Sequence, residues 1–277
     1  MSDTEKKVLQ LRRYRIELTA KSPIRVGAAE DPFRGVDNPV VVVGDKLVIP
    51  GSSLKGALRN QLERYFINEA NKRGKDSLKP CLATAEPSDF ERELIKKGKY
   101  ARKGCEFKNE RSVICPVCYF LGAQSLIGFV RVSFLHVMDK NLKAEVLTGI
   151  AIDRKTGTAR KGAIYKYEVI PEETKFEGEL EIVERDEQLG WEFGKPRYFT
   201  KYVKENEKER EKKYTPDKWL EEVNEFQNDK KLCEILKSCI EGIQLIGGYK
   251  SRGAGKVEIK LIGSSEESSE EKEEKKG

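Results

Sequence analysis

Four cysteines in the middle of the chain have the residue type and spacing to bind a metal ion. Cys115 and Cys118 form a C-x-x-C motif, which presents two thiolates to one ion, and Cys81 and Cys105 precede it in the same polar stretch. Four thiolates suit a closed tetrahedral zinc site, which stabilises a loop that lacks an apolar core. The alternative is four reduced thiols with C-x-x-C as a redox pair, although no thioredoxin-like βαβ pattern surrounds the motif.

A glycine-rich segment near the end of the sequence could approach a phosphate group. Gly247–Gly255 reads GGYKSRGAG, and its glycines let the backbone come close to a ligand. Lys250 and Arg252 supply positive charge there. A plain turn with surface charges remains the alternative.

The segment PGSSLKGALR predicts the start of a helix, with Ser52 or Ser53 as its N-cap. The free N–H groups of a helix start favour an anion. Lys55 and Arg59 are one turn apart and can flank the same groove. We therefore assign these four residues as candidate anion contacts, with a capped helix and solvated charges as the alternative.

A basic, Gly/Thr-rich segment between two apolar runs predicts a long hairpin tip. Tyr165 and Tyr167 follow it, and aromatic side chains in this position could stack on bases, or equally belong to a strand core. The candidate nucleic-acid-binding residues of the tip are Arg154, Lys155, Arg160 and Lys161.

Acid–base chemistry has few candidates. His136 is the only histidine, so neither a histidine pair nor a Ser/His/Asp triad can be built, and no GxxxxGK[ST] motif is present. Asp37 lies in a loop rich in Gly, Pro and Asp, within a segment expected to face any ligand bound over the sheet. Glu30 and Asp31 share that loop. Loop carboxylates usually do no chemistry, and that interpretation of Asp37 stays open.

The composition points to an anionic partner. The chain has 277 residues and a net charge of +6, and without the tail from Ser264 it has 50 basic against 41 acidic residues, or +9. No apolar run approaches ~18 residues, so we expect no membrane span. The start of the chain lacks the apolar core of a signal peptide, so we expect a cytoplasmic protein.

The elements that must position these residues predict an α+β fold. Leu11–Ala20 and Phe176–Val183 alternate as strands, and an apolar stripe follows the helix that begins near Ser53. Leu126–Met138 reads as one buried strand, and Lys201–Lys213 as a solvated insertion. The predicted order of strands and helices along the chain resembles a ferredoxin-like split βαβ layer. We expect one domain over residues 1–263 and a disordered acidic tail over 264–277.

Taken together, these motifs resemble the RAMP superfamily of CRISPR proteins, and most of all the repeated backbone subunit of type III (Csm or Cmr class) effector complexes. The resemblance spreads over most of the chain, although the glycine-rich loop departs from the usual spacing of the family. The matching segments are Arg34–Val40, Ile49–Arg59, Cys115–Gly122, Ile152–Pro171 and Gly247–Val257.

The resemblance implies an RNA-recognition-type core with a thumb hairpin at about 145–183 and a zinc-binding insertion at about 72–122. It implies several copies of the chain, with other subunits, along a CRISPR guide RNA. Asp37 matches an Asp in the first long loop of those family members that cleave target single-stranded RNA at regular steps with magnesium or manganese. Lys55, Arg59, Lys250 and Arg252 would hold guide phosphates.

Three alternatives remain at this point. The chain could be a structural guide-binding subunit with an inert Asp37. It could be a RAMP-type endoribonuclease that processes the guide precursor, although His136 lies outside any recognised motif. It could also be a free-standing zinc-containing RNA-binding module. The sequence leaves open the copy number, the partners, and the choice between the Csm and Cmr lineages.

Overall fold

The computed structural model describes residues 9–29, 35–84, 86–205 and 208–265. Most strands belong to one antiparallel sheet, and two further hairpins stand apart from it. In chain order the elements are β1 (Leu9–Ala20), β2 (Val42–Val43), β3 (Lys46–Ile49), α1 (Gly51–Arg73), η1 (Asp76–Leu78), α2 (Asp89–Lys96), α3 (Pro116–Leu121), β4 (Val130–Val132), β5 (Leu135–Val137), β6 (Glu145–Ile152), β7 (Ala159–Val169), β8 (Lys175–Asp186), β9 (Trp191–Glu192), β10 (Phe199–Glu205), β11 (Lys208–Tyr214), α4 (Lys218–Glu222), η2 (Asn224–Phe226), α5 (Asp229–Glu241), η3 (Lys250–Arg252) and β12 (Val257–Ser265).

The main sheet has the strand order β12-β1-β8-β5-β3-β2, with β4 and β9 also paired to β8. β1 is antiparallel to both β12 and β8. Ile16, Leu18 and Ala20 of β1 are fully buried, whereas Glu17 and Thr19 between them are partly exposed. β8 alternates in the same way, as its sequence predicts. One face of the sheet is therefore apolar and must be covered.

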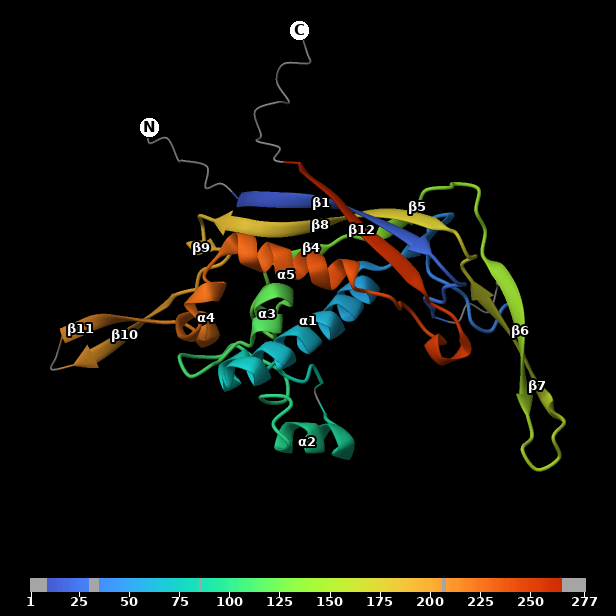
Figure 1. Cartoon of the computed structure of the whole chain (residues 1–277), viewed down its shortest axis with the longest axis horizontal. Coiled ribbons are helices and arrows are strands. Elements are labelled where there is room, and N and C mark those ends of the chain that lie inside the picture. The colour runs from blue at the N-terminus through green and yellow to red at the C-terminus, as the bar shows by residue number, and fades with distance from the viewer. Residues whose placement is uncertain (1–8, 30–34, 85, 206–207, 266–277) are drawn as a thin grey trace, which may run out of the picture.

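The helices α1, α3 and α5 cover that face (Figure 1). The apolar stripe of α1 is confirmed, because Leu54, Leu58, Leu62 and Phe66 are completely buried. The described helices include none with the length and apolar character needed to cross a bilayer. The mixed α+β class predicted from the sequence is confirmed.

Two local predictions are wrong. Neither Ser52 nor Ser53 caps α1, because the helix already begins at Gly51 with Pro50 at the N-cap and no side-chain cap. Gly51 is needed there, since a Cβ would collide with the Val132 carbonyl. The apolar run Leu126–Met138 is not one strand. It bends between β4 and β5, and α1 begins against that bend.

Two hairpins project from opposite ends of the molecule (Figure 1). β6 and β7 form the predicted basic hairpin. In the charged segment Lys201–Lys213, the residues whose side chains the structure describes are mostly exposed, as expected, but the segment is not irregular, because β10 pairs with β11. Phe199 at its base packs on Phe107, with ring centroids 4.4 Å apart. Of the predicted acidic tail, Ser264 and Ser265 extend β12, and residues 266–277 lie outside the described part.

A buried ion pair fixes the connection between the sheet and α4. Arg197 donates from Nε and Nη2 to the two carboxylate oxygens of Asp217, at 2.7 and 2.6 Å. Both side chains are 0% exposed. Arg197 also donates to the carbonyl of Ile127 and lies over the Tyr119 ring. Every charge of the pair therefore has a partner inside the core.

We expect Asp217→Asn to destabilise the protein by about 3–5 kcal/mol, because it leaves the Arg197 guanidinium buried without a counter-charge. Urea unfolding would measure the change. Glu192→Gln is the matched control, since it breaks the partly exposed contacts to Lys195 and Arg185 and should cost less than about 1 kcal/mol. Equal effects of the two variants would contradict a special role for the buried pair.

Candidate metal centre and nucleic-acid surface

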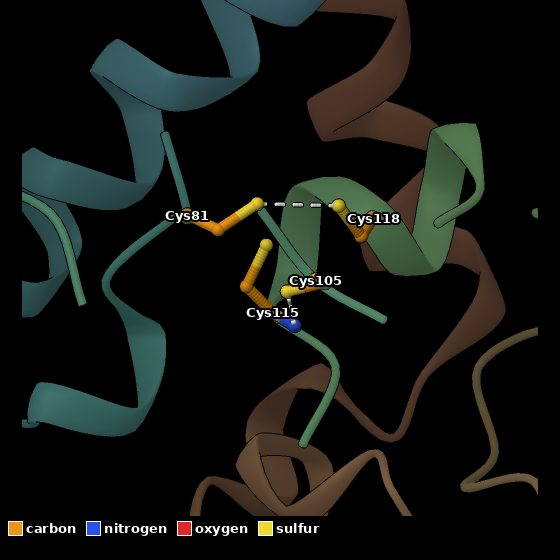
Figure 2. A group of neighbouring side chains, drawn as sticks. All are labelled: Cys81, Cys105, Cys115 and Cys118. Carbon is orange, nitrogen blue, oxygen red and sulfur yellow. Dashed lines mark hydrogen bonds between the residues drawn. The ribbon is translucent and has the colours of Figure 1, made fainter. Parts of the chain in front are cut away.

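The four cysteines converge on one point, although they come from three separate stretches of chain. Figure 2 shows their sulfur atoms turned toward one another. All four Sγ atoms lie within 4.8 Å of one another, and all four residues are buried. Cys81 follows η1, Cys105 lies in a loop, and Cys115 and Cys118 begin α3, where Pro116 occupies the first turn.

The cluster has the dimensions of a tetrathiolate site. Zinc–sulfur bonds of about 2.3 Å in a tetrahedron place the sulfurs about 3.8 Å apart. The Sγ atoms of Cys81 and Cys118 are 3.5 Å apart. The backbone N–H of Cys115 points at Cys105 Sγ, 3.4 Å away, as expected of a donor that stabilises a thiolate. The donor set therefore fits a metal such as zinc.

The pKa values of the four neighbouring thiols shift in opposite directions, with that of Cys118 lowered and those of Cys81, Cys105 and Cys115 raised. Hydrogen bonds from Cys105 and the other two cysteines lower the pKa of the Cys118 thiol. Burial raises the pKa of Cys115. Metal binding requires all four thiolates, so it must release protons and becomes weaker at low pH.

An open groove of about 870 Å³ lies beside the cluster. It is lined by the predicted cations Lys55 and Arg59, by Arg131, and by the loop around Gln124. Burial and then the charge of Arg59 lower the pKa of Lys55. Arg59 does not face outward as expected of a phosphate contact, since its guanidinium lies against Cys118 Sγ, 3.8–3.9 Å away.

Asp37 lies at the base of the β6–β7 hairpin. Its side chain is exposed, and Oδ2 accepts a hydrogen bond of 2.7 Å from the backbone N–H of Lys166 on β7. The next residue, Asn38, bridges to Tyr167 in parallel. The carboxylate is thus held against the hairpin, and the residue stays exposed. Glu30, Asp31 and Arg34 lie outside the described residues.

The glycine-rich loop meets the same hairpin base. Arg252 donates to the Tyr165 hydroxyl at 3.0 Å. Tyr249 lies between two guanidinium groups, those of Arg25 and Arg252, each 4.6 Å from its ring centroid. Arg25 in turn donates to Asn38 at 2.9 Å. The loop, β7 and the Asp37 segment therefore form one continuous surface.

A close crossing sets the path of this loop. Gly247 has φ +81°, and a Cβ there would collide with the Arg25 carbonyl. Tyr249 itself has φ +57°. The loop therefore presents Lys250 and Arg252 to solvent on η3.

The hairpin tip is polar and exposed. Arg154 and Lys155 lie in the turn, which the Asp153 carboxylate stabilises by accepting from the Lys155 N–H at 2.8 Å. Arg160 lies on β7 and is exposed. Lys161 also lies on β7, but its side chain is outside the described part. The tyrosines behind the tip face the glycine-rich loop, with Tyr167 and Tyr249 rings 5.2 Å apart.

The sequence interpretation missed three residues of these surfaces, namely Arg25, Tyr249 and Arg131. Arg25 and Tyr249 stand inside segments that had been singled out for their glycines, which was the available signal. The predicted residues fall into three groups on different elements, at the cysteine cluster, at the hairpin base and at the hairpin tip. His136 belongs to none of them, since it lines a groove on the open face of the sheet with Arg13 and Glu177.

Comparison with known proteins gives one family. The family model of the RAMP superfamily matches residues 17–258, from β1 into β12. The match therefore includes the cysteine cluster, both projecting hairpins and the glycine-rich loop. A search of curated proteins found no match. The chain belongs to the RAMP superfamily, which implies a CRISPR-associated, RNA-binding function.

Proposed function

We propose that the protein is a guide-RNA-binding backbone subunit of a type III CRISPR effector complex, and that the assembled complex cleaves complementary target RNA. The observation that carries this proposal is the convergence of Asp37, the β6–β7 hairpin and the glycine-rich loop on one surface. That surface combines an exposed carboxylate, cations and aromatic rings. Partners in this proposal are the guide, the single-stranded target, further copies of the chain and other subunits.

The strand order supports the ferredoxin-like form of the proposal. The sheet is antiparallel and has four strand positions in the order β12, β1, β8 and then β4 together with β5. The helices α1 and α5 lie on one face of it. The β6–β7 hairpin would be the thumb. Residues of about 72–122 would be the metal-binding insertion, although its α3 packs into the main core.

The proposed chemistry is attack of a ribose 2′-oxygen on the adjacent phosphorus. The P–O5′ bond breaks, leaving a 2′,3′-cyclic phosphate and a 5′-hydroxyl, with water protonating the leaving oxygen. Asp37 would orient the 2′-hydroxyl or accept its proton. Magnesium or manganese would add charge stabilisation at the phosphate, and one carboxylate together with RNA phosphates is a usual way to hold such an ion.

Phosphate contacts would come from hydroxyl and cationic side chains on both surfaces. Ser52, Ser53 and Lys55 lie at the start of α1, and Lys250 and Arg252 on the glycine-rich loop. The hairpin tip would add Arg154, Lys155, Arg160 and Lys161. Arg59 was assigned to the same group by sequence, and its contribution can be measured separately.

We expect the triple variant Lys55→Ala, Lys250→Ala and Arg252→Ala to bind RNA more weakly whatever its sequence. The log–log salt dependence of the binding constant should become shallower by roughly one unit per lost phosphate contact. Fluorescence anisotropy over a salt series measures this slope. The control variant is Lys237→Ala, which removes an exposed lysine of α5. An unchanged slope in the triple variant would leave these residues as solvated charges.

The whole proposal is tested by purifying the protein with its native partners and sequencing the bound RNA. A complementary target is then supplied with magnesium or manganese. Guide-derived RNA in a filament of copies, with regular cuts in the target, supports the proposal. Bound guide without cleavage favours a structural subunit, and cleavage of a guide precursor favours a processing enzyme. The exposed position of His136, outside both surfaces, weighs against the last alternative.

A further inference from the structure

A zinc ion held by four cysteines leaves an electrostatic problem for the surrounding protein. Four thiolates and one Zn²⁺ carry a net charge of about −2. The cysteines are between 0% and 7% exposed, so water screens this charge poorly. Buried charge without compensation is costly. A cation is therefore expected close to the sulfur atoms.

Arg59 occupies that position. Its Nη1 and Nη2 atoms lie 3.9 and 3.8 Å from Cys118 Sγ, so both arms of one planar fork face one sulfur. Its side chain is only 21% exposed. Lys55 lines the same groove one turn earlier but makes no such contact among the described residues. Of the two cations, Arg59 is thus the one committed to the cluster.

A second set of contacts orients the guanidinium. Glu63, one turn further along α1, lies 3.8 Å from Arg59 Nη1. Glu63 in turn accepts a hydrogen bond of 3.3 Å from the Tyr100 hydroxyl. Tyr100 belongs to the same insertion as Cys81 and Cys105. The chain Tyr100–Glu63–Arg59 therefore connects α1 to the metal-binding insertion and directs the fork at Cys118.

We propose that Arg59 is a charge-balancing and positioning residue of the metal centre, donating N–H···S bonds to Cys118, and is not a phosphate contact. This inference rests on zinc binding by the four cysteines and is independent of the RNA-binding function. Partners of this kind, one shell beyond the ligands, typically change metal affinity by about 10- to 100-fold. A phosphate contact would instead change the salt dependence of RNA binding.

The experiment measures both quantities on the full-length chain. Zinc affinity is determined by competition with a chromophoric chelator, and the cobalt-substituted protein reports ligand geometry by its absorption spectrum. RNA binding is followed over a salt series. The variants are Arg59→Met, which removes the charge but keeps most of the volume, Arg59→Lys, and Lys55→Met. Arg64→Met is the matched control, since Arg64 is an exposed arginine on the same helix.

We expect Arg59→Met to lower zinc affinity about 10- to 100-fold and to leave the salt slope unchanged. The zinc affinity of Arg59→Lys should lie between those of the native protein and Arg59→Met, because lysine keeps the charge without the planar fork. The zinc affinity of Arg64→Met should equal that of the native protein. Native zinc affinity in Arg59→Met, or a slope that becomes shallower by about one unit, would overturn the proposal. If Arg59→Met does not fold, Arg59→Lys decides: reduced zinc affinity supports the proposal and native affinity overturns it.

Discussion

Replacing Cys115 and Cys118 together by serine should abolish zinc binding and unfold the segment around the cluster. Native protein should hold about one zinc per chain, and the double variant none, because two of four thiolates cannot form a closed site. In structural zinc sites the apparent binding free energy is about 10–16 kcal/mol, which exceeds or equals the total stability of most domains. We therefore expect the largest loss of stability from this change.

The structure explains why the damage should spread beyond the insertion. Cys118 lies on α3, and the next two residues, Tyr119 and Phe120, are completely buried in the main core. The ring of Phe120 contacts Phe66 of α1, with centroids 6.1 Å apart. Loss of the metal should therefore loosen the packing of α1 and lower the melting temperature of the whole chain.

Metal analysis and a thermal melt, with and without a chelator, check this expectation. Cys233→Ser is the control, because this cysteine lies on α5 beside Arg12, outside the cluster. It should keep native zinc content. Full zinc content in the Cys115→Ser/Cys118→Ser variant, or a native protein without zinc, would show that the cluster is four reduced thiols.

Substitution of Asp37 should have the largest effect on activity. If Asp37 positions or deprotonates the 2′-hydroxyl, Asp37→Asn should slow target cleavage by the assembled complex roughly 10²–10⁴-fold. Asparagine keeps an oxygen that can accept the Lys166 N–H, so the loop should hold its place. Guide binding and assembly should be unchanged, because the carboxylate makes no phosphate contact. Gel analysis of a labelled target gives the rate.

Three comparisons make this result specific. Glu30→Ala and Asp31→Ala, in the same loop, should cleave at near-native rates. A target with a 2′-deoxy sugar at the cut position should resist, since its attacking oxygen is missing. The product of the native complex should end in a 2′,3′-cyclic phosphate. Near-native cleavage by Asp37→Asn would assign the protein to the structural-subunit alternative.

The sequence alone determined the parts that depend on local pattern and residue chemistry. The α+β class, the stripe of α1 and the alternation of β1 and β8 follow from the 3.6- and 2-residue periods of buried positions. The β6–β7 hairpin follows from two apolar runs around a polar tip. The four cysteines could be grouped as candidate metal ligands from type and spacing, and their convergence confirms the grouping.

Other local features needed information from neighbouring elements. α1 begins at Gly51 and not after Ser52 or Ser53, and the residue there must be glycine because the β4–β5 bend leaves no room for a side chain. Lys201–Lys213 has the composition of a solvated loop. The aromatic packing at its base, between Phe199 and Phe107, joins distant segments and could not be predicted from the local sequence. Charged residues can form strands when their partners across the ladder supply the hydrogen bonds.

Only the tertiary structure decided which loops meet and which way a long side chain turns. Arg25 and Arg252 are far apart in sequence, yet both guanidinium groups lie over the ring of Tyr249. Arg252 also donates to Tyr165 of the hairpin base, and Arg25 donates to Asn38, next to Asp37. In the sequence, Arg59 is simply a second cation one helical turn after Lys55. In the structure its side chain is directed at Cys118, and this direction depends on Glu63 and Tyr100. Such contacts are set by the packing of distant segments, which no local period or spacing encodes.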